Sequence, residues 1–179
     1  MRDWNVVASI YQDGFRRAIR ALEKLGPVER SPYHNVLVLK VEGGTSFLEA
    51  VERKTEESPA VYDAISRIAP AIRNFEFQSA EQFKERAISV LREWSQQRAG
   101  RSFHIRLHRR GARQDLRTPA TERSLNEAAL AATTEGGTPG RLSFADPDVV
   151  VAIDTVDDRA GMALWTREDL ARHRLLRPD

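Results

Sequence analysis

The spacing of apolar residues alternates between strand-like and helix-like patterns along the whole chain. Apolar runs or a two-residue period, both typical of β-strands, occur at 6–10, 36–41, 68–72, 74–77, 103–108, 149–153 and 162–165. Helical spacing or helix-start signals occur at 15–25, 46–53, 60–66, 79–100, 118–132 and from residue 166 onward. The chain is therefore predicted to mix helices and strands throughout its length.

The order of these elements predicts two domains. The first half has a strand, a helix, a strand, further helix and a strand, which suits a small ferredoxin-like sandwich with one strand not located. A new unit begins at Ser79, where Ser79 and Gln82 have the spacing of a helix capping box. We therefore predict an α/β (α+β) protein with a ferredoxin-like domain over 1–78 and a second domain over 79–179.

The segment 103–108 has two chemically different faces. Phe103, Ile105 and Leu107 alternate with two histidines and an arginine, so a strand here turns its apolar side chains to one face and its cationic ones to the other. We expect the apolar face to pack on helices and the cationic face to point to solvent.

Positive charge is concentrated around this strand. Residues 98–117 contain seven arginines and one acidic residue, Asp115, so this window carries +6 whereas the whole chain carries +2. Arginine matches phosphate geometry, so the pattern predicts a polyanionic partner; the alternative is a solvated basic strand. The candidate contact residues are Arg98, Arg101, His104, Arg106, His108, Arg109, Arg110, Arg113 and Arg117.

Composition excludes several classes of protein. The chain has 179 residues and no cysteine, so a disulfide scaffold, a thiolate nucleophile and a cysteine zinc site are excluded. No run approaches the roughly 20 apolar residues that a membrane span needs, and the N-terminus lacks the pattern of a signal peptide. A cytoplasmic protein is the simplest expectation.

Sequence signals for catalysis, metals and cofactors are weak. The pairs Gly43-Gly44 and Gly136-Gly137 lack the spacing of phosphate-cradling loops and are interpreted as turns. His104 and His108 lie roughly 13 Å apart along a strand and cannot share a metal. The acidic residues within 146–158 fit strand ends better than a Mg²⁺ site. We expect no metal and no cofactor.

Three stretches, taken in order, resemble the THUMP domain of tRNA-modifying proteins. They are Ser102–Gly111 (SFHIRLHRRG), Asp146–Val156 (DPDVVVAIDTV) and Arg159–Trp165 (RAGMALW). The chain is most similar to the stand-alone THUMP proteins that act as adaptors in tRNA cytidine acetylation. The resemblance covers roughly residues 79–179 and extends more weakly to the first half, where the family has a ferredoxin-like domain.

The resemblance implies a function in tRNA recognition. The cationic residues would bind the acceptor end of tRNA, and the ferredoxin-like domain would measure the distance to the modified nucleotide. The chain would present tRNA to a separate, acetyltransferase-like modifying enzyme. Because no catalytic domain follows residue 179, we expect a binding module and not an enzyme. The alternative is an interaction or regulatory module whose basic strand binds an acidic protein.

Overall fold

The structure, a computed structural model, describes residues 1–111 and 115–177. They form two compact units, one of residues 1–72 with 170–177 and one of residues 73–169. The predicted domains 1–78 and 79–179 stay a prediction, since compactness alone does not establish independent folding. None of the helices in the described part of the chain combines the length and the apolar character that crossing a bilayer requires.

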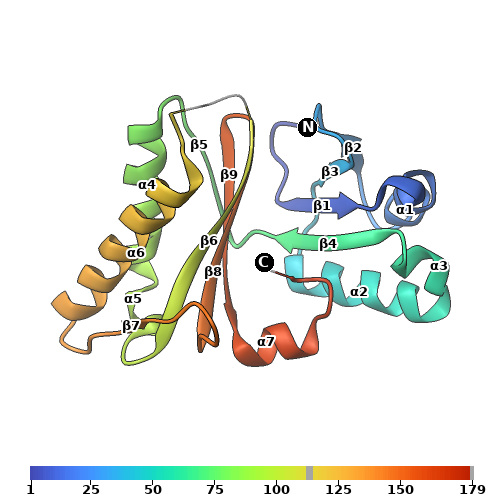
Figure 1. Cartoon of the computed structure of the whole chain (residues 1–179). Coiled ribbons are helices and arrows are strands. Elements are labelled where there is room, and N and C mark those ends of the chain that lie inside the picture. The colour runs from blue at the N-terminus through green and yellow to red at the C-terminus, as the bar shows by residue number, and fades with distance from the viewer. Residues whose placement is uncertain (112–114, 178–179) are drawn as a thin grey trace. The chain divides into compact units, whose positions relative to one another are not determined.

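The first unit has the ferredoxin-like order of strands and helices (Figure 1). Its sheet has the order β2-β3-β1-β4, with every neighbouring pair antiparallel. The elements are β1 (Val6–Ile10), η1 (Gln12–Gly14), α1 (Phe15–Leu22), β2 (Val28–Arg30), β3 (Val36–Leu39), α2 (Gly44–Glu57), α3 (Pro59–Tyr62) and β4 (Ile65–Pro70). The strand that the sequence did not locate is β2, which has three residues and is too short to show a period.

The last turns of the chain belong to the core of this first unit. The backbone N–H of Ile68 on β4 donates to the carbonyl of Leu175 at 2.8 Å, and Leu175 and Leu176 are buried. Nδ1 of the buried His173 lies 2.8 Å from a carboxylate oxygen of Glu52 on α2. These contacts attach residues 170–177 to β4 and α2.

The second unit is a five-stranded sheet covered on one face by helices α4 and α6 (Figure 1). The strand order is β5-β9-β8-β6-β7; β6 runs parallel to both of its neighbours, and the other pairs are antiparallel. The elements are β5 (Arg73–Glu76), α4 (Ala80–Glu93), α5 (Ser95–Arg98), β6 (Ser102–Arg110), α6 (Thr118–Glu135), β7 (Arg141–Leu142), β8 (Val149–Val156) and β9 (Arg159–Thr166), after which α7 (Arg167–Arg172) leads into the first unit.

The apolar face of β6 lies at the centre of the second core. Phe103, Ile105 and Leu107 are buried in one cluster with apolar side chains of α4, α6 and β8. The predicted helix start at Ser79 is confirmed, because its hydroxyl accepts the backbone N–H of Gln82 at 3.0 Å. The predicted α/β class and the apolar side of the strand are therefore confirmed.

The outer edge of β6 is completed by side chains of α6, because its neighbour β7 has only two residues. The amide of Ile105 donates to the side-chain oxygen of the buried Asn126 at 3.0 Å. The amide of Leu107 donates to a carboxylate oxygen of Glu122 at 2.7 Å. Backbone N–H groups that no strand satisfies thus find acceptors one helical turn apart on α6.

This arrangement predicts that Asn126→Ala destabilises the second unit. The substitution leaves the buried amide of Ile105 without an acceptor, which costs about 1–3 kcal/mol of the free energy of unfolding. Glu127→Ala, at the exposed neighbouring position, is the control and should change stability by less than about 0.5 kcal/mol. Urea unfolding measures both, and equal stability of the two variants would show that Ile105 finds another acceptor.

Candidate nucleic-acid interface

The cationic side chains of β6 lie on the sheet face opposite to the apolar cluster. His104, Arg106, His108 and Arg110 alternate with the core residues and are in register with Val150, Ala152, Asp154 and Val156 of β8. The prediction that the strand has two different faces is confirmed. The expectation that the cationic face points freely to solvent is wrong, since His104 is buried and the other three are half-buried.

Arg98 has a structural position that excludes it from an exposed interface. Its side chain is 0% exposed, and its guanidinium donates to the carbonyls of Leu91 at 2.7 Å and Trp94 at 3.0 Å. These carbonyls belong to the end of α4, where helical partners are missing and positive charge is favourable. The guanidinium also lies 5.3 Å from the ring centre of Phe103. Burial lowers the pKa of Arg98 to about 10, so it remains cationic at neutral pH.

His104 supports a loop and does not reach the surface. Only 2% of its area is exposed, and its Nδ1 lies 2.8 Å from the carbonyl oxygen of Ser143. The ring of Phe144 stacks on the imidazole, with centres 5.5 Å apart and planes inclined by 27°. Direct contact between this histidine and a large ligand therefore requires Phe144 to move.

Arg110 is engaged in an ion pair inside the second unit. Its guanidinium donates to the carboxylate of Asp154 at 2.9 Å, and these side chains are 18% and 5% exposed. A buried carboxylate needs such a partner, because desolvation penalises an isolated charge. The expectation that Arg110 is a surface residue is therefore wrong.

Three of the predicted residues are exposed, and they lie at the two ends of β6. Arg101 precedes the strand, Arg109 lies near its last residue, and Arg117 immediately precedes α6. The span from Arg101 to Arg109 is roughly 26 Å at the rise of an extended strand. Nη1 of Arg109 donates to the carbonyl of Gly111 at 2.9 Å. Arg113 lies outside the described residues.

Two further exposed arginines were not predicted as contact residues. Arg141 on β7 pairs with Ser102, and its amide donates to the carbonyl of Arg101 at 3.0 Å, so two arginines lie together at the start of β6. Arg123 is exposed on the first half of α6. Neither residue belongs to the arginine-rich window 98–117. The parallel pairing of β7 with β6 brings Arg141 beside this window. The sequence does not predict this pairing, because a strand of two residues is too short to show a period.

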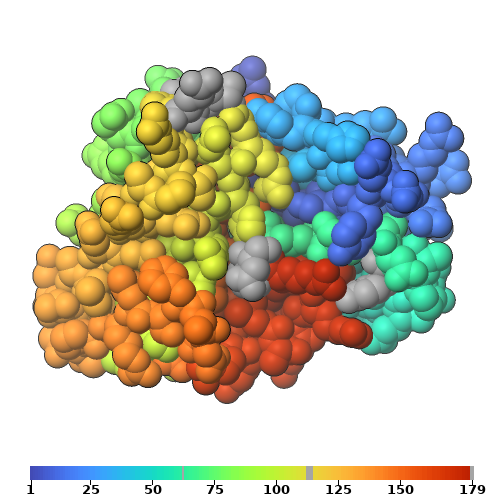
Figure 2. Space-filling view, viewed as in Figure 1, coloured from blue at the N-terminus to red at the C-terminus, as the bar shows by residue number. Residues whose placement is uncertain are grey.

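The guanidinium groups of the exposed arginines are available for a ligand. Among the described residues, no side-chain hydrogen bond or ion pair involves Arg101, Arg117, Arg123 or Arg141, although the charge of Arg141 contributes to the lowered pKa of Asp148. Figure 2 shows that the orange segment, from the end of α6 through β7 toward β8, lies on the surface of the second unit. Exposed guanidinium groups of this kind can bind anionic groups.

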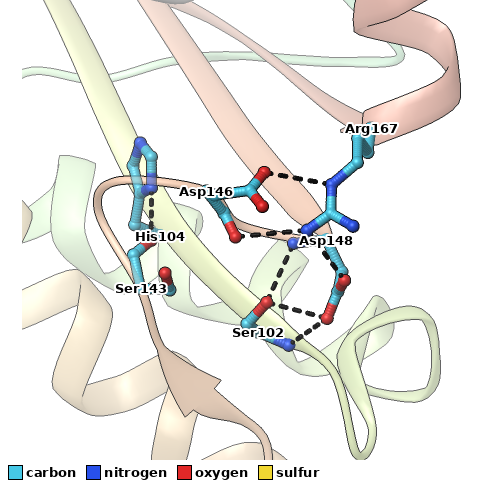
Figure 3. A network of polar contacts seen from close by, with 6 residues as sticks. All are labelled: Ser102, His104, Ser143, Asp146, Asp148 and Arg167. Carbon is cyan, nitrogen blue, oxygen red and sulfur yellow. Dashed lines mark hydrogen bonds and ion pairs between the residues drawn. The ribbon is translucent and has the colours of Figure 1, made fainter.

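A polar network fixes the loop between β7 and β8 (Figure 3). One carboxylate oxygen of Asp148 accepts the Ser102 amide at 2.8 Å and the Ser102 hydroxyl at 2.7 Å. Arg167 forms ion pairs with Asp146 at 3.1 Å and with Asp148 at 3.3 Å. The hydrogen bonds from Ser102 are the main reason that the pKa of Asp148 lies below its ordinary value. These acids anchor the loop, as the strand-end interpretation predicted.

No protein-family model and no curated protein sequence matches the chain. Solved structures do match in fold. PH1313 from Pyrococcus horikoshii is 14% identical with a TM-score of 0.58, over 90% of this chain and 54% of that one. TrmN from Thermus thermophilus is 17% identical with a TM-score of 0.55, over 89% and 44%. A 4-thiouridine synthetase in complex with RNA and ATP is 12% identical with a TM-score of 0.50, over 90% and 41%.

These similarities support the THUMP-like fold that the sequence resemblance implies. The chain spans about half or less of the length of each of these structures. The shared part therefore comprises both units of this chain, and the solved proteins contain further residues beyond it.

The prediction that the protein is not an enzyme is contradicted by the same comparisons. Several similar structures are of proteins described as methylases or methyltransferases, one of them as a predicted N6-adenine-specific DNA methylase from Listeria monocytogenes. The chain covers 40 to 42% of these proteins at 11 to 14% identity. The prediction rested on the observation that no catalytic domain follows residue 179. The position of the last residue is not evidence about catalysis, because proteins described as methyltransferases share this fold.

Arg98 and Arg101 should respond oppositely to the same substitution. Arg98→Ala removes two hydrogen bonds at the end of α4 and a buried side chain, which should cost about 2–4 kcal/mol of the free energy of unfolding. Arg101→Ala removes an exposed side chain and should cost less than about 0.5 kcal/mol. Chemical unfolding measures both, and equal losses would contradict the structural role of Arg98.

The carboxyl group of Asp148 should titrate below its ordinary pKa in the folded protein. Because folding lowers this pKa, the stabilisation is complete above the unfolded pKa of about 3.9 and is lost as pH falls through the folded pKa. A ¹³C NMR titration of the carboxyl group measures the midpoint. Ser102→Ala should raise that midpoint by removing the hydroxyl donor, and an unchanged midpoint would contradict the assignment.

Proposed function

We propose that this chain is a tRNA-binding module that presents tRNA to an active site for nucleotide modification. The observation that carries this proposal is the set of exposed guanidinium groups at both ends of β6, with Arg101 and Arg141 at one end and Arg117 at the other. Guanidinium groups bind phosphate oxygens in pairs of parallel hydrogen bonds. Such an arrangement fits a polymer of phosphates.

The spacing of the arginines favours a long ligand over a small one. The two ends of β6 lie roughly 26 Å apart, so no single phosphate or mononucleotide reaches both. A folded RNA presents phosphates over such distances. Because backbone contacts hold and orient a nucleic acid without reading its sequence, this surface suits a module that positions a substrate.

The similar structures support RNA as the polymer. One of them is a 4-thiouridine synthetase in complex with RNA, aligned with 90% of this chain. The resemblance of residues 79–179 to THUMP domains favours tRNA among RNAs, and its acceptor end as the part bound. By the same resemblance, we propose a role like that of the adaptor proteins of tRNA cytidine acetylation.

Binding of tRNA should weaken steeply with salt. If three to five of the exposed arginines neutralise phosphates, the slope of log K against log salt concentration should lie between about −2 and −4. The double substitution Arg101→Ala/Arg141→Ala should make the slope less negative by about 1 to 2. Fluorescence anisotropy with labelled tRNA measures the slope.

Arg92→Ala is the matched control, because Arg92 is exposed on α4 and belongs to neither of the two arginine groups at the ends of β6. It removes one positive charge, as each of the two substitutions in the double variant does, and should leave the slope unchanged. A flat salt response would overturn the proposal. Equal competition by polyglutamate and by unlabelled tRNA would instead favour the acidic-protein partner.

A further inference from the structure

One aromatic ring stands out on the surface of the second unit. Phe144, in the loop between β7 and β8, is 61% exposed, whereas most large apolar side chains of this unit are buried. Its ring is stacked on the buried imidazole of His104, with 5.5 Å between centres. One face of the ring is therefore supported from below, and the side chain remains open to a ligand.

The loop that carries Phe144 is held by contacts on both sides of it. The carbonyl of the preceding residue, Ser143, binds Nδ1 of His104 at 2.8 Å, and the Ser143 amide donates to the carbonyl of Phe103 at 3.0 Å. Beyond Phe144, Asp146 and Asp148 are tied to Arg167 (Figure 3). A ring held in this way loses little conformational freedom when a ligand stacks on it.

Exposed positive charge lies close to this ring along the chain. Arg141 is three residues before Phe144, and Arg101 is its neighbour across the β6–β7 pair. Both side chains are exposed and form no ion pair with the described residues, and Arg141 acts on Asp148 only through its charge, which contributes to the lowered pKa of that carboxylate. An exposed aromatic ring near exposed guanidinium groups matches the two parts of a nucleotide, a base that stacks and phosphates that bind cations.

We propose that Phe144 is a stacking platform for an unpaired RNA base, with Arg101 and Arg141 binding the phosphates that flank it. The inference rests on the proposed function and adds to it a contact that depends on the base. His104 is a positioning residue: it supports the ring and anchors Ser143. A duplex buries its base faces, so this platform selects a single-stranded nucleotide within the bound RNA.

The test compares two RNA hairpins that differ only in a short single-stranded overhang. One overhang carries bases, and the other carries abasic nucleotides with the same phosphates. The wild-type protein should bind the base-bearing hairpin about 5- to 150-fold more tightly, the range expected for one stacked base. Phe144→Ala should reduce this ratio to near 1 and leave the salt slope unchanged.

Matched variants separate stacking from folding and from general apolar contact. Phe144→Trp should keep the preference, whereas Phe144→Leu, which still covers His104, should lose it. Leu142→Ala is the control, because Leu142 is a partly exposed apolar residue of the same edge segment and should keep the full ratio. Circular dichroism verifies that each variant is folded.

The outcomes distinguish this inference from the proposed function. A full preference for bases in Phe144→Ala or Phe144→Leu overturns the platform while RNA binding stands. Salt-dependent binding of both hairpins with a ratio of 1 in the wild-type protein also overturns only the platform. Failure to bind either hairpin or tRNA overturns both proposals.

Discussion

The fold of the second unit depends on which groups accept hydrogen bonds from the backbone amides at the outer edge of β6. β7 covers only the first residues of this strand, and buried amides beyond Phe103 would have no acceptor without α6. Asn126 and Glu122 provide acceptors, so α6 must lie along β6 in one register. That register places Arg117 beside the end of the strand and returns the chain, through β7, to place Arg141 beside its start. The positions of the cationic groups thus follow from the need to satisfy a β-edge.

The arginines near this strand are of two kinds, those that stabilise the fold and those that are exposed. Arg98 is buried at the end of α4, and Arg110 neutralises the buried Asp154, so both belong to the folded structure. Arg101 and Arg141 are exposed and make no ion pair with described residues, although the positive charge of Arg141 contributes to the lowered pKa of Asp148. Net charge in a window of sequence counts both kinds equally. The local value of +6 therefore overstates the charge available to a ligand.

Much of the fold could be predicted from the sequence, because its long elements have strong periods. The ferredoxin-like first unit, the two faces of β6 and the buried β8 were all predictable from apolar spacing. β2 and β7 were missed because two or three residues cannot show a period. The site was less predictable for a different reason. Arg98 and Arg101 are three positions apart and chemically identical, and only tertiary packing buries one and exposes the other.

Tertiary packing also explains why the exposed ring of Phe144 was not predicted as part of a site. In the sequence, Phe144 follows a serine and precedes a turn, and nothing in this spacing distinguishes a ring that completes a core from one that covers a histidine. The parallel pairing of β6 and β7 brings residues 141–144 alongside residues 102–104, about forty positions earlier in the chain. Charge from Arg101 and an aromatic surface from Phe144 then belong to one edge of the sheet. Phosphates alone make RNA binding electrostatic and tolerant of sequence, whereas a ring at that edge adds a requirement for an unpaired base. A module that combines the two can bind the body of a folded RNA loosely and fix its register at a single-stranded nucleotide.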